Sequence, residues 1–240
     1  MPRFPIRQSQ IKNNQASISG SDYRHIIKVL RLKPGNAITL FDEKGLEHFG
    51  KISELGSKEI TITITGSKRV DNESILNITL LQGIPKGDKM DYIVEKATEL
   101  GVKTIAPVIT ERSQVRNAKR IDRWRRIVLE SSKQSGRMIP PNILDVTSFE
   151  NAIDFNDTGN LQIILHEKCR DKIRDIINKV NKTSNKVKLF IGPEGGFTKG
   201  EVIKAKTKGF IPIGLGPRIL RTETAAIVAV TVMQYLYGDF

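Results

Sequence analysis

Two glycine-rich stretches near the end of the chain contain the residues best suited to binding a ligand. The first reads GPEGGFT at 192–198 and the second reads LGPRILRTETA at 215–225. Glycine lets a backbone turn sharply and come close to a ligand. Each stretch follows an apolar, strand-like run and precedes a helix start, which Thr198 with Glu201 and then Thr222 can cap. Loops at the carboxyl ends of strands bind ligands in open α/β sheets, so the pair predicts a binding site.

The spacing of these loops excludes two common ligand classes. Neither loop has the P-loop pattern G-x-x-x-x-G-K-[ST], and the nearest segment elsewhere, from Gly83 to Lys89, has the wrong spacing. No G-x-G-x-x-G follows a strand-like run. A P-loop nucleotide triphosphatase and a Rossmann dinucleotide-binding protein are therefore disfavoured. One such loop alone would be read as an ordinary turn, whereas two close together favour a function.

The two stretches resemble the SPOUT methyltransferases, and specifically the RsmE family. The resemblance covers nearly the whole chain and implies methylation of N3 of a uridine in 16S ribosomal RNA, with S-adenosylmethionine as cofactor. It further implies that the partner is 16S ribosomal RNA or the small ribosomal subunit, and that the protein is a homodimer. The other segments that carry the resemblance are His25–Arg31, Lys33–Gly35, Asp91–Val102, Thr110–Ser113 and Gln134–Pro140.

The N-terminal part predicts a small, mainly β domain. Apolar residues alternate in Ala37–Phe41, Leu46–Ile52 and Ile60–Ile64, after a short helix at Gly20–Leu30. Residues 1–70 hold 12 Lys and Arg against 6 Asp and Glu. The resemblance implies that residues 1–72 form a PUA-like RNA-binding β-barrel.

A different pattern begins after the polar segment Val70–Ser74. Strand-like and helix-like segments alternate from there on, which predicts an α/β domain with a parallel sheet. Connection rules favour an ordinary open sheet, whereas the resemblance implies a SPOUT domain at 73–240 with a C-terminal trefoil knot. The strands are expected at Leu76–Gln82, Thr104–Ile109, Leu161–Leu165, Val187–Ile191 and Ile211–Gly214, and the helices at Lys89–Leu100, Lys119–Ser135, Arg170–Lys182, Lys199–Lys208 and Thr222–Tyr237.

Composition points to a cytoplasmic, nucleic-acid-binding protein. The 240 residues include 39 Lys and Arg against 26 Asp and Glu, a net charge of +13 that suits a polyanionic partner. The single cysteine, Cys169, excludes an intrachain disulfide framework and fits a reducing compartment. The N-terminal residues lack the apolar core of a signal peptide, and no apolar run reaches membrane-spanning length. The three histidines and the cysteine predict no metal site.

The resemblance implies a cofactor cleft made by three loops. Apolar side chains would form walls around the adenine, and the glycines would bring backbone N–H and C=O groups within hydrogen-bonding distance. His166 is the weakest candidate, since a histidine at a strand end is commonly only a polar surface residue. The cofactor-binding candidates are Leu165, His166, Ile191, Gly192, Pro193, Glu194, Gly195, Gly196, Leu215, Gly216, Arg218, Ile219 and Leu220.

Methyl transfer to uracil N3 requires loss of the N3 proton and stabilisation of the negative charge that spreads onto O2 and O4. Arg221 and Arg218 are candidates for stabilising this charge. Glu194 is the candidate base, although solvent could take the proton instead. Arg137 matches the family's QSGR motif, is expected near the active cleft and is a further catalytic candidate.

Basic side chains supply the candidate RNA contacts. Nine Lys and Arg occur from Arg112 to Arg137, where a solvated helix face and binding of RNA phosphates are the two alternatives. Trp124 is expected in the core. The RNA-binding candidates are Arg3, Arg7, Arg24, Lys28, Arg31, Arg112, Arg116 and Arg137.

Two other functions stay open at this point. One is a SPOUT methyltransferase that acts on another RNA or another position. The other is a non-catalytic RNA-binding factor for ribosome assembly, which would transfer no methyl group.

Overall fold

The computed structural model describes residues 2–42, 44–70, 72–114, 120–154, 161–169 and 185–240. The chain divides into two compact units. The first comprises Met1–Glu73 and Lys133–Ile139, and the second comprises Ser74–Ser132 and Pro140–Phe240. The return of Lys133–Ile139 to the first unit was not predicted. The functional assignment of residues 1–72 to RNA binding and 73–240 to catalysis stays a prediction.

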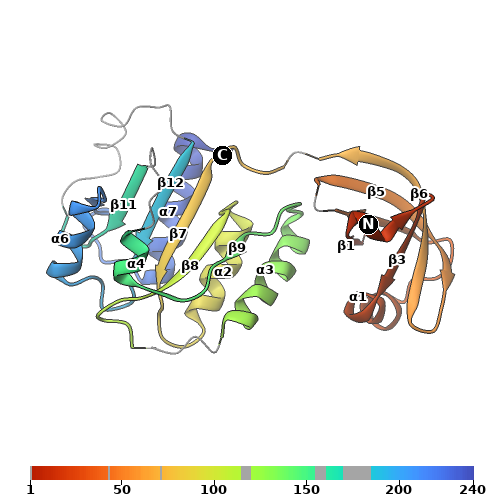
Figure 1. Ribbon diagram of the computed structural model, residues 1–240, viewed down its shortest axis with the longest axis horizontal. Coiled ribbons are helices and arrows are strands. Elements are labelled where there is room, and N and C mark those ends of the chain that lie inside the picture. Colours follow the sequence, from red (N-terminus) through yellow and green to blue (C-terminus); the bar gives the residue numbers. More distant parts are fainter. Residues whose placement is uncertain (1, 43, 71, 115–119, 155–160, 170–184) are drawn as a thin grey trace. The chain divides into compact units, whose positions relative to one another are not determined.

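The first unit is built on a six-stranded sheet with the order β1-β4-β5-β6-β3-β2 (Figure 1). The predicted strands are confirmed, and two of them extend further than the alternation indicated. The predicted helix is a short α-helix that continues as a π-helical turn. The elements are β1 (Arg3–Pro5), η1 (Gln8–Gln10), β2 (Ile11–Lys12), β3 (Gln15–Ser19), α1 (Gly20–Arg24), η2 (His25–Val29), β4 (Ala37–Phe41), β5 (Leu46–Leu55) and β6 (Glu59–Arg69).

Alternation along these strands produces the core of the first unit. Side chains two residues apart lie on the same face of a sheet, and the side chains of Ile60 and Ile62 in β6 are both fully buried. Ile26 of η2 packs into the same cluster, with Ile27 and Leu30 partly buried beside it. The apolar side chains of this helical segment therefore form one face that packs on the sheet.

The second unit contains a parallel sheet with the order β10-β8-β7-β12-β11-β13, and β9 also pairs with β8. Every strand predicted here is present, and so are the helices that fall on described residues. The helix expected at Arg170–Lys182 lies outside the described residues, while β9, β10 and α4 were not predicted. The elements are β7 (Asn77–Gly83), α2 (Lys89–Glu99), β8 (Thr104–Ile109), α3 (Ile121–Ser135), β9 (Asn142–Ile143), β10 (Thr147–Ser148), α4 (Phe149–Ile153), β11 (Leu161–Leu165), β12 (Lys186–Ile191), α6 (Lys199–Thr207), β13 (Ile211–Ile213) and α7 (Thr222–Tyr237).

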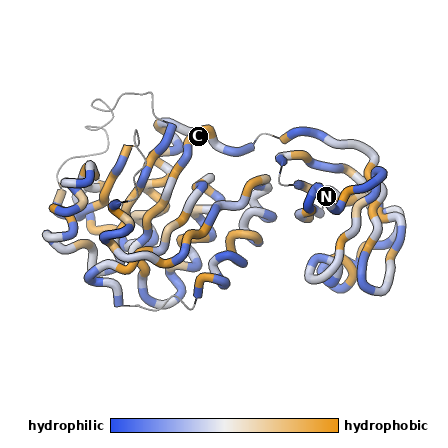
Figure 2. The backbone as a smooth tube through the Cα atoms, in the orientation of Figure 1, coloured by the Kyte–Doolittle hydropathy of each residue, from blue (hydrophilic) through white to orange (hydrophobic). Residues whose placement is uncertain are grey.

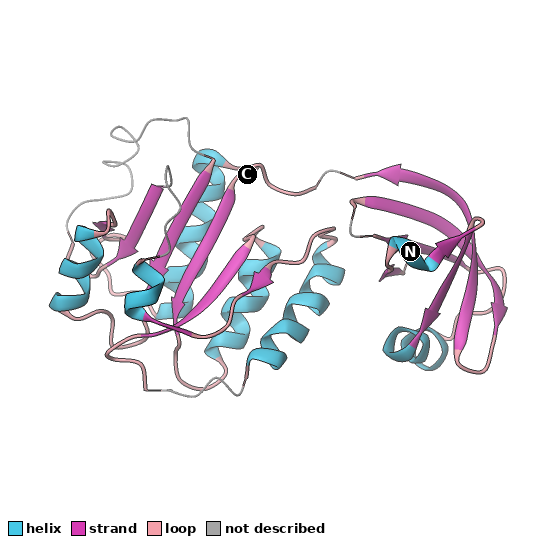
Figure 3. Cartoon of the chain, in the orientation of Figure 1, coloured by secondary structure: helices cyan, strands magenta, loops and turns pink. Residues whose placement is uncertain are grey.

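Apolar layers cover both faces of this sheet, which is the usual arrangement for parallel strands. In β12, Leu189 packs in the layer formed with α2, α3 and α7, and Phe190 packs in the layer formed with α4 and α6. Figure 2 shows the apolar runs along these strands, and Figure 3 shows helices around the sheet. Trp124 is 2% exposed and its Nε1 donates to Asp91 Oδ1 at 3.0 Å, so its predicted place in the core is confirmed.

The last part of the chain crosses the sheet. Strand β13 pairs with β11 at the sheet edge. Helix α7 packs against β12 and α2 instead. The segment between them therefore passes the carboxyl ends of β11 and β12, which brings it next to the loops that leave those strands.

A buried amide anchors the C-terminal end of α7. Gln234 is fully buried; its Oε1 accepts a hydrogen bond from Ser74 Oγ at 2.7 Å and its Nε2 donates to Leu100 O at 2.8 Å. Buried polar groups that keep their partners stabilise a fold, and losing one partner leaves the other desolvated. No helix in the described part of the chain is long and apolar enough to cross a membrane.

Gln234→Leu should lower the stability of the second unit. Leucine leaves the Ser74 hydroxyl and the Leu100 carbonyl buried without this partner, which is expected to cost about 1–3 kcal/mol. Chemical denaturation followed by fluorescence of Trp124, the chain's single tryptophan, measures the change. An unchanged unfolding midpoint would show that the amide does not stabilise this end of the helix.

Candidate active site

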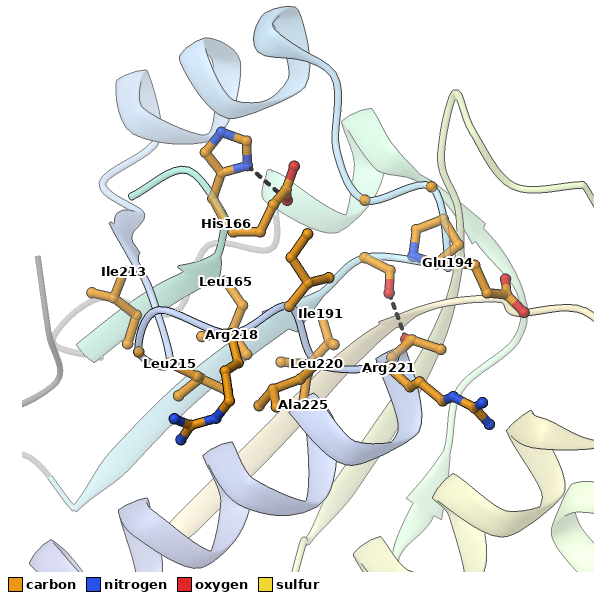
Figure 4. A pocket seen from close by; sticks show the side chains of 18 of the residues that line it. Leu165, His166, Ile191, Glu194, Ile213, Leu215, Arg218, Leu220, Arg221 and Ala225 are labelled. Atoms are coloured by element: carbon orange, nitrogen blue, oxygen red, sulfur yellow. Dashed lines mark hydrogen bonds and ion pairs between the residues drawn. The ribbon is translucent and has the colours of Figure 1, made fainter. Parts of the chain in front are cut away.

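A cavity of about 690 Å³ opens at the carboxyl ends of β11, β12 and β13 (Figure 4). Its size is within the range of small-molecule sites. The three loops that leave these strands form its walls. The lining residues are Lys89, Leu165, His166, Glu167, Ile191, Gly192, Pro193, Glu194, Gly195, Gly196, Ile213, Leu215, Gly216, Arg218, Ile219, Leu220, Arg221, Thr222 and Ala225.

All the residues expected to bind the cofactor line this one cavity, as does Arg221. Sequence reasoning missed Lys89, Glu167, Ile213, Thr222 and Ala225. Ile213 and Ala225 lie in the predicted strand and the predicted helix that flank the last loop, so the sequence could have identified them. Lys89 belongs to a distant segment, and no local pattern connects it with Glu194.

The loop after β12 has a backbone that only small residues allow. Gly196 has φ +63°, a conformation that L side chains rarely adopt. At Gly192 a Cβ atom would lie 3.1 Å from the backbone of Gly196, so the two ends of the turn are in direct contact. The predicted capping box is present, with Thr198 Oγ1 accepting from Glu201 N and Glu201 Oε2 accepting from Thr198 N. The sharp turn therefore leads directly into α6.

Glu194 is held in place by groups from the β7–α2 segment. Its Oε1 accepts from Lys89 Nζ at 2.7 Å and from the Lys86 N–H at 3.1 Å. Partial burial raises the pKa of the Glu194 carboxyl, but the hydrogen bonds, led by that from Lys89, lower it more, and the net pKa is below 4.5. The carboxylate is therefore ionised near neutral pH and weakly basic, which does not suit the predicted role of general base.

Arg112 holds the same loop from its other side. Its Nη1 donates to the Gly195 carbonyl at 2.6 Å. The buried Glu201 carboxylate accepts from the Glu111 N–H at 2.9 Å, so the segment after β8 is joined to the start of α6. Arg112 was expected to bind RNA. In the structure its guanidinium contacts the glycine loop, and its binding to RNA stays a prediction.

Arg218 and Arg221 both line the cavity, and both are exposed. Their guanidinium groups lie on opposite sides of the view in Figure 4, with Arg221 on the side of Glu194. Within the described residues neither side chain makes a hydrogen bond or an ion pair, so each keeps its charge for a ligand. His166 is mostly buried, and its Nδ1 lies 3.5 Å from Glu167 Oε2.

Arg137 does not line the cavity. It belongs to the first unit, where its Nη2 donates to Glu73 Oε2 at 2.6 Å, and it is almost fully buried. The arginine of the QSGR motif is therefore in a buried ion pair, and its charge is already neutralised by Glu73. Arg3 is likewise paired with Glu47 and lies over the ring of Phe41.

Four of the other RNA-binding candidates are exposed, and one lies outside the described residues. Arg7, Arg24, Lys28 and Arg31 are exposed on the first unit. Arg116 lies outside the described residues. Within the described residues, these four exposed side chains make none of the internal ion pairs found for Arg3 and Arg137.

Comparison with known proteins agrees with this architecture. Residues 71–234 match the family described as RNA methyltransferase domain, and residues 18–65 match the RNA methyltransferase PUA domain. A relative from Buchnera aphidicola (subsp. Acyrthosiphon pisum), named ribosomal RNA small subunit methyltransferase E, is 34% identical over 100% of this chain and 95% of its own length.

Two solved structures are similar over their whole length. One is a ribosomal RNA small subunit methyltransferase E from Neisseria gonorrhoeae bound to S-adenosyl methionine, with a TM-score of 0.89 and 39% identity over 100% of this chain and 99% of that chain. The other is a putative methyltransferase from Legionella pneumophila in complex with bound SAM, with a TM-score of 0.90 and 34% identity over the same shares. The resemblance read from the sequence is thereby confirmed, and the chain belongs to the ribosomal RNA small subunit methyltransferase E family.

Proposed function

We propose that this enzyme methylates N3 of a uridine in 16S ribosomal RNA, with S-adenosylmethionine as methyl donor. The observation that carries the proposal is the shared cavity at the ends of β11, β12 and β13, which contains every residue expected to bind the cofactor. The relatives' names support the small-subunit RNA, and the two similar structures with bound cofactor support the donor. Position N3 rests on the family resemblance.

The cavity residues fit S-adenosylmethionine. Leu165, Ile191 and Leu220 offer apolar walls for an adenine ring, and the close turn at Gly192 and Gly196 exposes backbone groups to its edge. When bound, the cofactor supplies an electrophilic methyl group on a sulfonium centre. Uracil N3 would accept this methyl group after losing its proton to solvent.

Arg221 is the residue proposed to stabilise the uracil anion. A neutral imide nitrogen is a poor nucleophile, so the reaction depends on the anionic form, whose charge resides largely on O2 and O4. A guanidinium with several fixed donors stabilises such a delocalised charge. Arg221 lines the cavity as the N-cap of α7, and no internal acidic group neutralises it among the described residues.

Two of the catalytic candidates have no part in the proposed mechanism. Glu194 is replaced as base by solvent, because its carboxylate is committed to Lys89 and its pKa is low. Arg137 is left out because Glu73 already pairs with it. Glu194 keeps a role in the cofactor site, where its contacts hold the glycine loop against the β7–α2 segment.

RNA affinity is proposed to come from the first unit. The match to a PUA domain and the exposed Arg24, Lys28 and Arg31 support this assignment. Exposed cations bind phosphates through charge and counterion release, without reading the sequence. The first unit would therefore bind the RNA, and the second would carry the chemistry.

The trefoil knot, the homodimer and the cytoplasmic location are further parts of the proposal. The passage of the chain from β13 across the ends of β11 and β12 to α7 supports a threaded C-terminal segment. Ile227, Val228 and Val232 of α7 are only partly buried, which leaves apolar surface for a second copy. Sedimentation of the purified protein at the mass of one chain would exclude the dimer.

The methylated nucleoside that the enzyme produces distinguishes the proposed function from its alternatives. Digestion of treated 16S RNA to nucleosides would show N3-methyluridine if the proposal holds. Another methylated nucleoside would indicate a different target for the same site. Absence of any methyl transfer, to naked RNA and to small subunits alike, would favour the non-catalytic assembly factor.

Arg221→Ala should lower the single-turnover rate of uridine methylation by about 10²–10³, because it removes a charge-stabilising donor. The affinity for S-adenosylmethionine, measured by calorimetry, should stay within a few-fold. Arg218→Ala is the matched control and should have the smaller effect on the rate. Loss of cofactor binding in Arg221→Ala would instead assign Arg221 to the cofactor site.

Glu194→Gln should change the single-turnover rate at pH 7–8 by less than tenfold, since glutamine can still accept from Lys89 and from Lys86 N–H. The Glu194 pKa is already below its usual value of 4.5, so the carboxylate titrates only under acidic conditions. The pH profile between 5 and 8 should therefore keep its shape in the variant. A loss of 10²–10⁴ with disappearance of an acidic limb would restore Glu194 as the base.

Arg24→Gln with Lys28→Gln should weaken RNA binding and make the slope of log K against log salt shallower, by about one for each phosphate that the variant no longer neutralises. Filter binding between low and moderate salt measures the slope. Lys68→Gln, which changes another exposed lysine, in β6 and outside the candidate set, is the control. Equal slopes for both variants would show that phosphate binding is not confined to the candidates.

A further inference from the structure

A chain of buried hydrogen bonds lies beneath the cofactor cavity. Gln82, at the carboxyl end of β7, has no exposed surface, and its Nε2 donates to Thr222 Oγ1 at 3.0 Å. Thr222, the first residue of α7, is 4% exposed, and its hydroxyl donates to the Gly192 carbonyl at 2.6 Å. The second bond is the dashed line beside Arg221 in Figure 4. The chain therefore connects three separate segments of the second unit.

The direction of each hydrogen bond follows from the available donors. The Gln82 Nε2 atom also lies 2.9 Å from the Gly83 carbonyl, and of the two ends of a side-chain amide only the NH2 group can donate to a carbonyl oxygen. Because this nitrogen has no lone pair to offer, Thr222 accepts from it. The single hydroxyl proton of Thr222 is then available for Gly192, so the amide dictates where the threonine proton points.

A close backbone contact lies beside this chain. A Cβ atom at Gly83 would come within 2.6 Å of Pro193 Cδ, so the end of β7 packs directly on the start of the glycine loop. Gly192, Pro193 and Thr222 all line the cavity, whereas Gln82 and Gly83 do not. Gln82 therefore acts on the cavity only through the residues it holds.

We propose that Gln82 and Thr222 are positioning residues for the methyl donor, a role that rests on the proposed cofactor site. Their hydrogen bonds fix the distance between the Gly192 carbonyl and the start of α7. Since the glycine loop and the last loop form facing walls, this distance determines the width of the cavity.

The opposite end of α7 provides a matched comparison. Gln234 is also a fully buried amide and also bonds a hydroxyl and a carbonyl, those of Ser74 and Leu100. None of these three residues lines the cavity. Loss of either amide is expected to reduce stability, but only the Gln82–Thr222 pair is expected to affect the cofactor.

The test compares Thr222→Val, Thr222→Ser, Gln82→Leu and Gln234→Leu in the full chain, by calorimetric titration with S-adenosylmethionine. Valine keeps the shape of threonine without the hydroxyl, and the dissociation constant should rise at least tenfold, which corresponds to about 1.4 kcal/mol. Serine keeps the hydroxyl and should restore affinity to within about twofold. Gln82→Leu removes the hydrogen bond to Thr222 but keeps the one from Thr222 to Gly192, so it should give an intermediate increase in the dissociation constant. Gln234→Leu should leave the dissociation constant unchanged.

Steady-state kinetics separates positioning from general damage. The KM for S-adenosylmethionine should rise in Thr222→Val, while kcat at saturating cofactor falls less than threefold. Equal affinity in wild type and Thr222→Val, or an equal loss in Gln234→Leu, would overturn the inference. Failure of the wild-type chain to bind S-adenosylmethionine would overturn the proposed function instead. If Thr222→Val does not fold, Gln82→Leu decides by the same comparison with Gln234→Leu.

Discussion

The site depends on one topological constraint, which is that the last strand and the last helix lie at different places along the sheet. Strand β13 extends the edge beyond β11, while α7 covers β12 and packs on α2. The chain between them must pass over the carboxyl ends of the intervening strands. Those ends already carry the loops after β11 and β12, so the crossing closes a cavity that neither loop could form by itself.

A cavity made from three loops needs those loops held at a constant spacing, and polar contacts from neighbouring segments provide this. Glu194 is bound from the β7–α2 segment, and the Gly195 carbonyl is bound by Arg112 from the segment after β8. The polar residues around the glycine loop therefore act together as a rigid support for a ligand.

The distribution of charge also depends on tertiary pairing. The chain is strongly basic, yet several of its cations already have acidic partners: Arg3 pairs with Glu47, Arg137 with Glu73 and Lys133 with Asp22. Such pairs remove those side chains from the set that can neutralise RNA phosphates. The exposed cations of α1 and η2 remain available for that purpose. Net charge thus indicates the class of partner, whereas burial and internal ion pairs determine which basic residues are available to contact that partner.

The sequence by itself determined the elements and the location of the ligand site. Alternation with period two placed β4, β5 and β6, and the two glycine stretches identified the loops that meet in the cavity, because local steric preference and capping depend on neighbouring residues. It did not determine the partners of charged groups. Glu194 was interpreted as a base and Arg137 as a catalytic cation, whereas Lys89 and Glu73 bind them from distant segments. Such pairings are decided only when the strands assemble, since side chains a hundred residues apart share no local pattern and meet only through the tertiary fold.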